Sequence, residues 1–142
     1  MKSERSIYLA SGSPRRRELL RQIGVSFRVI SADLDETVLP EELPLAYVSR
    51  LAQAKARLGW EHGRDADGAP VLAADTAVVL DGRILGKPAD MENAISMLRE
   101  LSSRTHEVLT AVALRTAAGT QLKVSRSMVA FRAIDAAEAR DY

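Results

Sequence analysis

The spacing of apolar and polar positions predicts an α/β chain. An apolar run over 7–10 and an alternating run over 27–31 flank a segment with helical spacing that begins at Pro14. A strand, a helix and a strand in this order favour a parallel βαβ unit. Pro44 begins a second helical stretch. Its apolar positions are Leu45, Val48, Leu51, Ala52 and Leu58.

The most apolar stretch of the chain, 71–80, is interrupted only by Asp75 and the threonine after it. Asp81 and Gly82 follow directly and form a strong two-residue turn signal. We therefore expect the last four residues of this stretch to pair with 83–85 in a β-hairpin.

The remaining segments complete a pattern of mixed strands and helices. Asp90 suits the N-cap of a helix, and strands are expected over 105–116 and 121–133, with helix-favouring residues after Asp135. The polar stretch 59–70 has no period and is expected to be a surface loop. The order predicts one α/β domain with a mixed, twisted sheet flanked by helices. The apolar face of the helix after Asp90 holds Met91, Ile95, Leu98 and Leu101.

Composition narrows the classes of function. A length of 142 residues, 46% hydrophobic and 27% charged, is typical of one globular domain. A net charge of +1 argues against general affinity for nucleic acid. The chain has no cysteine and only two histidines, His62 and His106, which excludes disulfides and disfavours a zinc centre. Without a membrane-length apolar stretch or a signal-like N-terminus, a cytoplasmic protein is expected.

The loop 11–13 has the features of an anion site. Ser13 is a good N-cap and Pro14 suits the first helical position, so free backbone N–H groups should face the loop. Arg15 and Arg16 lie beside them, and a helix N-terminus with arginines suits phosphate. The alternative is a solvated basic start to an ordinary helix.

Two further segments have open alternatives. The acidic loop 33–37 should lie at the same sheet edge as the loop 11–13, where its carboxylates would hold Mg²⁺ together with substrate phosphates; otherwise it is a solvated turn. Lys55 lies within the apolar stripe of its helix and either extends to the surface or points into a cleft to meet phosphate. Three neighbours look like ordinary surface charges: Arg50, Arg57 and Glu61.

Three later residues are candidates for chemistry. Asp75 stands between two buried strand segments, where a carboxylate is costly unless it is paired or used. It would act as a general base on water or as a metal ligand. Lys87 follows the predicted hairpin on a turn between Gly86 and Pro88. His106, at a strand start, either contacts a ligand or is structural.

Together these motifs resemble the Maf family of nucleoside triphosphate pyrophosphatases over essentially the whole chain. The resemblance implies a fold like that of the inosine triphosphate pyrophosphatases, with a deep cleft between two lobes. It also implies hydrolysis of a nucleoside triphosphate to the monophosphate and pyrophosphate with Mg²⁺ or Mn²⁺. The motifs that carry it are Leu9–Leu20, Asp35-Glu36, Lys55, Ala74-Asp75-Thr76, Gly86-Lys87-Pro88 and His106–Thr110.

The resemblance also assigns roles. Asp75 would be the proton acceptor, and Arg16 and Thr76 would set substrate specificity. Metal would be held by Glu36 and Asp75. The motif Ser-Gly-Ser-Pro-Arg-Arg is similar to the branch that acts on dTTP and UTP; the alternatives are the branch for N7-methylguanosine triphosphate and a catalytically impaired nucleotide-binding remnant. Phosphate would be bound by Ser11, Ser13, Arg15, Arg16, Lys55 and Lys87.

The resemblance leads to expectations about partners and about the C-terminal side. The partner would be a nucleoside triphosphate, with neither nucleic acid nor membrane, and a homodimer is an open alternative. Family members continue through a segment of the type Gly-Gly-Tyr-x-Ile-Gln-Gly, which this sequence lacks. We therefore expect a single domain, 1–142, without the last sheet strands and part of the cleft wall, and with core surface exposed.

Overall fold

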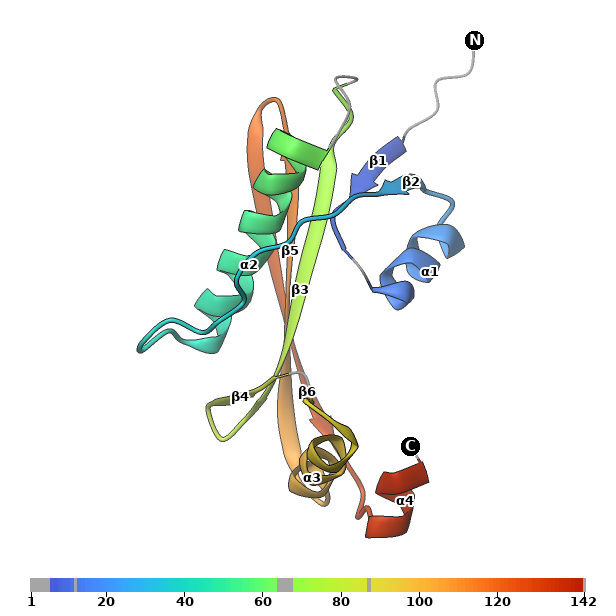
Figure 1. Ribbon diagram of the computed structural model, residues 1–142, viewed down its shortest axis with the longest axis vertical. Coiled ribbons are helices and arrows are strands. Elements are labelled where there is room, and N and C mark those ends of the chain that lie inside the picture. The colour runs from blue at the N-terminus through green and yellow to red at the C-terminus, as the bar shows by residue number, and fades with distance from the viewer. Residues whose placement is uncertain (1–5, 12, 64–67, 87, 142) are drawn as a thin grey trace. The chain divides into compact units, whose positions relative to one another are not determined.

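The computed structural model describes residues 6–11, 13–63, 68–86 and 88–141. The described strands form a six-stranded mixed sheet in the order β2-β1-β3-β5-β6, with β4 paired to β3 (Figure 1). The strands are β1 (Ser6–Leu9), β2 (Ser26–Val29), β3 (Val71–Leu80), β4 (Arg83–Leu85), β5 (Thr105–Thr116) and β6 (Gly119–Ala130). The helices are α1 (Pro14–Gln22), α2 (Pro44–Leu58), α3 (Met91–Leu101) and α4 (Ala136–Asp141), with a π-helical turn, η1 (Gly59–Gly63), after α2.

The chain divides into two compact units. The first comprises residues 1–75 with 111–124, and the second comprises 76–110 with 125–142. The first unit holds β1, β2, α1 and α2, and the second holds β4, α3 and α4. The three long strands β3, β5 and β6 each pass from one unit into the other.

The first unit opens with the predicted parallel βαβ arrangement. β1 pairs in parallel with β2, from Ser6 opposite Ser26 to Leu9 opposite Val29. Between them, the Ser13 hydroxyl accepts a hydrogen bond from the backbone N–H of Arg16 (3.4 Å), as expected of an N-cap. The strands, the helix and its cap are therefore all confirmed.

α2 supplies much of the core of this unit. Its buried face is continuous through the middle turns, because these positions recur every three or four residues. Leu45 was predicted on this face but is 38% exposed, since it lies in the first turn of the helix, ahead of the buried stretch. The buried residues of α2 are Val48, Leu51, Ala52 and Ala56.

The prediction of a surface loop from residue 59 was wrong at its start. η1 continues α2, and Gly59 is buried. A Cβ atom at Gly59 would lie 2.8 Å from Cγ1 of Val71 and 2.9 Å from Cδ1 of Ile30. Only glycine lets the helix end approach the β3 start this closely.

The second unit confirms the hairpin and the helix cap. β3 and β4 are antiparallel, with Val79 opposite Ile84, and the turn residues Asp81 and Gly82 have φ angles of 53° and 75°. The Asp90 carboxylate accepts from the N–H of Asn93 (2.8 Å) and caps α3. Met91, predicted to face the core, is 65% exposed because it is the first residue of that helix.

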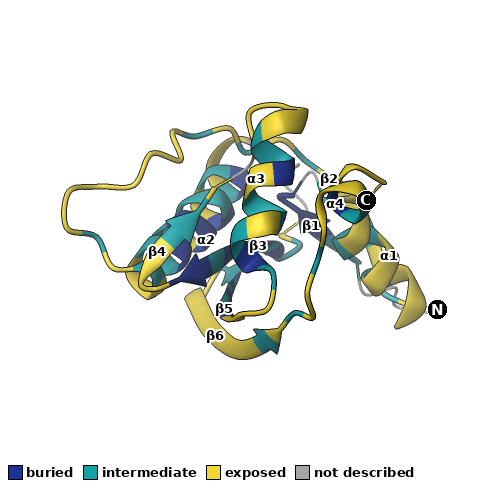
Figure 2. Cartoon of the chain, turned by 90° about the horizontal axis from the view of Figure 1, so that it is seen from below, coloured by how far each residue is buried: buried dark blue, intermediate teal, exposed yellow. Residues whose placement is uncertain are grey.

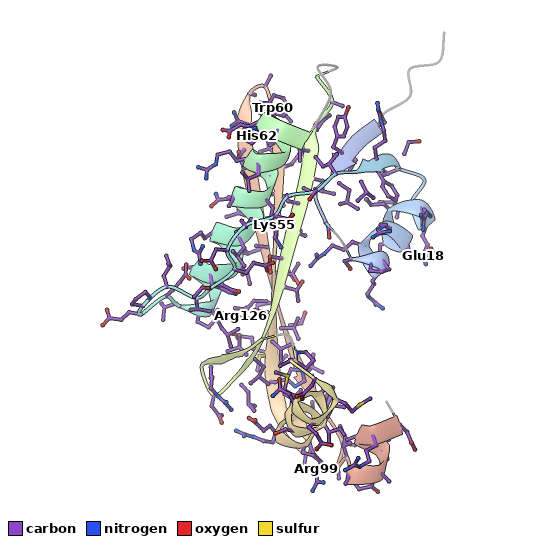
Figure 3. The ribbon with its side chains drawn as sticks, in the orientation of Figure 1. Glu18, Lys55, Trp60, His62, Arg99 and Arg126 are labelled. Carbon is purple, nitrogen blue, oxygen red and sulfur yellow. The ribbon has the colours of Figure 1, made fainter. Side chains whose placement is uncertain are left out.

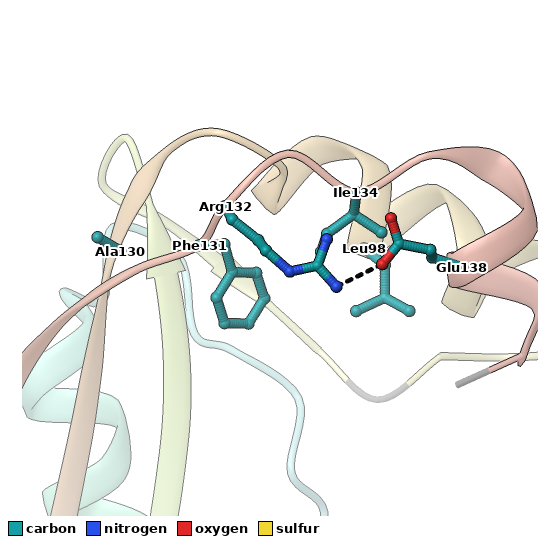
Figure 4. Close-up of a pocket in the computed structure, with 6 residues that line it drawn as sticks. All are labelled: Leu98, Ala130, Phe131, Arg132, Ile134 and Glu138. Carbon is teal, nitrogen blue, oxygen red and sulfur yellow. Dashed lines mark hydrogen bonds and ion pairs between the residues drawn. The ribbon is translucent and has the colours of Figure 1, made fainter.

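A cavity of about 460 Å³ lies in the second unit (Figure 4). The Arg132 guanidinium pairs with the Glu138 carboxylate at this cavity. His106 is buried and meets Phe131 edge to face, with 4.8 Å between ring centroids, which favours the structural reading of this histidine. The lining residues are Leu98, Ala130, Phe131, Arg132, Ile134 and Glu138.

Strand β6 is exposed over nearly its whole length (Figure 2). Its apolar side chains Leu122, Val124 and Met128 are 36%, 49% and 64% exposed. Among the described residues, no helix combines the length and the apolarity needed to cross a membrane.

Candidate functional site

The loop before α1 is shaped by its own serines. Ser11 is buried, and its hydroxyl accepts from the N–H of Ser13 (3.2 Å) and from Nη1 of Arg16 (3.1 Å). The Ser13 hydroxyl is the helix cap already described. The serines therefore fix the loop and aim Arg16, while Gly12 lies outside the described residues.

Lys55 links two carboxylates that come from separate parts of the first unit. Its Nζ lies 2.7 Å from Oδ2 of Asp75 on β3 and 3.6 Å from Oε1 of Glu36 in the acidic loop. The side chains of Lys55 and Asp75 are 17% and 10% exposed, whereas that of Glu36 is 43% exposed. Lys55 thus points inward from α2, where Figure 3 labels it beside β3, and Asp75 has the partner that its burial demands.

Arg16 belongs to the same group of charges. Burial lowers the pKa of its guanidinium from the ordinary value, and the negative charge of Asp75 acts in the opposite direction. An electrostatic effect of this kind requires the two groups to be near each other. The first unit therefore brings together five of the predicted site residues: Ser11, Arg16, Glu36, Lys55 and Asp75.

The two carboxylates of the acidic loop have different partners. Asp35 accepts from the N–H of Thr37 (2.9 Å) and from its hydroxyl (2.5 Å), and these hydrogen bonds lower the pKa of Asp35. Asp35 therefore stabilises the turn itself. Glu36, the next residue, is the carboxylate that reaches Lys55.

Two residues of this site escaped the sequence prediction. The Tyr47 hydroxyl donates to the backbone carbonyl of Glu36 (2.6 Å). Arg50, predicted to be an ordinary surface charge, instead donates twice to Glu42 (2.7 and 2.9 Å) and once to the Thr37 carbonyl (3.1 Å). One sequence signal was available, since Tyr47 and Lys55 are eight residues apart and hence on one helix face.

The other candidates have different surroundings or are not described. Thr76 is exposed and belongs to the second unit, where its hydroxyl lies 3.1 Å from that of Thr110. Arg15 is exposed at the start of α1. Lys87 lies outside the described residues.

The donor set fits a magnesium ion in part. Within the described ranges, no group of three or more acidic or histidine side chains is arranged to hold a metal. Glu36 and Asp75 nevertheless share contact with one ammonium group, which places two carboxylates around a common point. Mg²⁺ is usually held by one or two carboxylates, with water and substrate phosphates as the other ligands. Two carboxylates are therefore enough when a phosphate ligand supplies the rest.

Taken together, the site sets a buried carboxylate beside a lysine and an arginine. The cations suit a phosphate-bearing ligand, because they offset its negative charge at close range. The carboxylate suits removal of a proton from water. Both features come from one unit, on the loop before α1, the acidic loop, α2 and β3.

Comparisons with known proteins identify relatives of the whole chain. The profile of the family described as Maf-like protein matches residues 6–142. A protein of Nitrosospira multiformis named dTTP/UTP pyrophosphatase is 50% identical over 149 residues, covering 98% of this chain and 72% of the relative. A protein of the same name from Hahella chejuensis is 48% identical, covering 97% and 69%. Among solved structures, the Staphylococcus aureus Ham1 protein aligns with a TM-score of 0.53 at 18% identity, covering 88% of this chain and 71% of that one, which shows a shared fold.

Proposed function

The chain belongs to the family of Maf-like proteins, and from that premise we propose that it hydrolyses nucleoside triphosphates, dTTP and UTP foremost, to the monophosphate and pyrophosphate. Support for the substrate comes from relatives of about half-identical sequence that bear the name dTTP/UTP pyrophosphatase. The observation that carries the proposal is Lys55 held between Asp75 and Glu36, close to Arg16.

Asp75 is proposed as the general base. A water oxygen attacks the α-phosphorus, the bond from that phosphorus to the bridging oxygen breaks, and pyrophosphate leaves with the bonding electron pair. Asp75 accepts the proton that the water loses. A carboxylate this buried needs a partner of opposite charge, and the Lys55 ammonium, with Nζ 2.7 Å from Oδ2 of Asp75, is that partner.

The loop before α1 is proposed to bind the phosphates. Arg16 and Arg15 bring positive charge to the N-terminus of the helix, whose backbone N–H groups also favour an anion. The hydroxyls of Ser11 and Ser13 support this site by holding the loop, given their internal hydrogen bonds. Stabilisation of charge on the phosphate oxygens is the main electrostatic requirement of such a reaction.

Three further roles belong to the same proposal. Glu36 and Asp75 would hold Mg²⁺ or Mn²⁺, which when bound would neutralise charge on the substrate phosphates. Lys87 would add a cation on the phosphate side, and Thr76 would contribute to the choice of nucleotide together with Arg16. The substrates are free nucleotides, so a cytoplasmic location accompanies the proposal.

The test is pyrophosphate release from a panel of dTTP, UTP, N7-methylguanosine triphosphate and ATP with Mg²⁺, by the wild-type chain and Asp75→Asn. We expect release from dTTP and UTP above the others. Loss of a general base lowers turnover by about 10²- to 10⁴-fold. Binding of dTTP to Asp75→Asn, measured by calorimetry, should stay within a few-fold of wild type.

The matched control is Asp33→Asn, which removes an exposed carboxylate of the acidic loop that accepts a hydrogen bond from the Ser31 hydroxyl (3.4 Å). It should retain wild-type turnover. Undiminished pyrophosphate release by Asp75→Asn would refute the role of that residue. A wild-type chain that binds nucleotide but releases no pyrophosphate would refute the proposed activity and favour a binding protein.

A further inference from the structure

Glu36 lies in a segment with no helix or strand, residues 30–39, yet its carboxylate meets a lysine on a helix. An irregular segment on its own samples many conformations, and ordering each residue costs about 1–2 kcal/mol. Something outside the segment must therefore hold it in place.

The first contact that does so is made by Tyr47. Its hydroxyl donates a hydrogen bond to the backbone carbonyl of Glu36 at 2.6 Å. Tyr47 therefore holds the backbone of the residue whose side chain contacts Lys55. Burial raises the pKa of Tyr47, and the charges of Asp75 and Glu36 raise it further. The tyrosine hydroxyl therefore lies near both carboxylates.

The second contact is made by Arg50, one turn further along α2. Its Nη2 donates to the carbonyl of Thr37 (3.1 Å), the residue after Glu36. The same guanidinium grips Glu42 through two hydrogen bonds, and Oε1 of Glu42 accepts from the N–H of Leu39 (3.0 Å). A two-pronged arginine–carboxylate contact fixes orientation as well as distance.

We propose that Tyr47 and Arg50 are positioning residues that hold residues 35–42, the end of the acidic loop and the segment after it, against α2 and so fix the place of Glu36 relative to Lys55 and Asp75. The proposal rests on the function given above, because it assigns the two residues to that same site. Neither residue touches the reacting atoms. Each acts through the backbone or side chains of the loop that carries Glu36.

The geometry explains why both residues come from α2. Tyr47 and Lys55 lie on one face of the helix, two turns apart, and Arg50 lies between them in sequence. α2 thus carries both the two residues that hold the loop and the lysine that contacts the Glu36 carboxylate. Displacement of a reacting arrangement by about 1 Å can cost about 10²-fold in rate.

The test is a double-mutant cycle with Tyr47→Phe, Arg50→Lys and Glu36→Gln, assayed by pyrophosphate release from dTTP. Each of Tyr47→Phe and Arg50→Lys should lower kcat by about 10- to 100-fold, with KM for dTTP changed less than about threefold. In the Glu36→Gln background, each should cost less than about twofold more, because both act through Glu36.

A second readout does not depend on activity. Hydrogen–deuterium exchange of the backbone amides of residues 35–42 should be faster in Tyr47→Phe and Arg50→Lys than in the wild type. Binding of Mn²⁺ alone, followed by electron paramagnetic resonance, should weaken several-fold in both. The matched control is Arg57→Lys on the exposed side of α2, which should change neither measurement.

Each outcome decides the proposal. Unchanged exchange over 35–42 in both variants would overturn it, as would losses of kcat that multiply in full with that of Glu36→Gln. An inactive wild-type chain would refute the function proposed above, and the exchange measurement would still decide whether the two residues fasten the loop. Equal melting temperatures of the variants and wild type would show that the effects are local.

Discussion

Replacement of Lys55 by methionine should destabilise the first unit more than loss of either carboxylate partner. Methionine keeps the length and apolar stem of the side chain but removes the ammonium, which leaves the nearly buried Asp75 carboxylate without its partner at 2.7 Å. In Asp75→Asn, by contrast, the amide oxygen still accepts from the ammonium, which also keeps Glu36 at 3.6 Å. Both substitutions remove the ion pair between Lys55 and Asp75. Lys55→Met leaves a carboxylate without a cation, whereas Asp75→Asn leaves an ammonium that still has an acceptor and a carboxylate nearby.

The magnitudes follow from the burial of each group. Removal of one partner of a fully buried ion pair costs about 3–5 kcal/mol. Because the Lys55 and Asp75 side chains retain 17% and 10% exposure, respectively, we expect about 2–4 kcal/mol for Lys55→Met. For Asp75→Asn we expect about 1 kcal/mol, the worth of an ordinary hydrogen bond. The double substitution Lys55→Met with Asp75→Asn should restore most of the stability lost in Lys55→Met, since neither member of the ion pair is then left charged without the other.

The assay is urea unfolding followed by the fluorescence of Trp60, the single tryptophan of the chain. With a slope of about 1–3 kcal/mol per molar urea, a loss of 3 kcal/mol shifts the midpoint by about 1–3 M. Arg57→Met, an exposed cation on the same helix, should move the midpoint by less than about 0.5 M. If Asp75→Asn costs as much as Lys55→Met, or the double substitution is the least stable, the reasoning is refuted.

Three further predictions concern local structure. Gly59→Ala should lower the free energy of unfolding by about 1–3 kcal/mol, because its Cβ would lie 2.8 Å from Cγ1 of Val71. Gly86→Ala, with open space around it, is the control. A gain in stability for Gly59→Ala would contradict the packing. Asp90→Ala should cost about 1 kcal/mol through loss of the α3 cap, whereas Asp90→Asn should keep it; equal melting of the two would contradict the cap. The hydrogen bonds from Arg50 lower the pKa of Glu42. This contact therefore stabilises the fold above the unfolded pKa of about 4.3, and its contribution is lost as pH falls through the folded pKa. Parallel acid-unfolding curves for wild type and Glu42→Gln would refute this.

Much of the fold was predictable because its signals are local. The cap at Ser13, the proline after it and the Asp81-Gly82 turn each fix backbone geometry within a few residues. The hairpin register followed from that turn alone. Met91 and the leucine in the first turn of α2 were misassigned because helical spacing gives the face of a residue, while burial also depends on how far the packed surface extends along the helix.

The candidate site was predictable only where a charged residue interrupts an apolar pattern of the sequence. Asp75 interrupts a buried strand and Lys55 interrupts an apolar stripe, so each pointed to a partner before the partner was known. Their pairing with each other is now a property of the structure. Helical spacing placed Tyr47 on the face of Lys55 but indicated no partner for it or for Arg50, because their role depends on the path of an irregular loop, which no periodicity encodes.

The close approach of α2 to β3 at Gly59 has a consequence for how the site fails. The spacing between Lys55 and Glu36 is internal to the helix and the loop fastened to it, whereas the spacing between Lys55 and Asp75 spans the interface of helix and strand. A substitution that lifts α2 from the sheet would therefore separate the Asp75 carboxylate from the Lys55 ammonium while leaving the acidic loop and the lysine together. Under the roles proposed above, damage to the packing would act first on proton transfer to Asp75, whereas damage to the loop would act first on metal binding by Glu36.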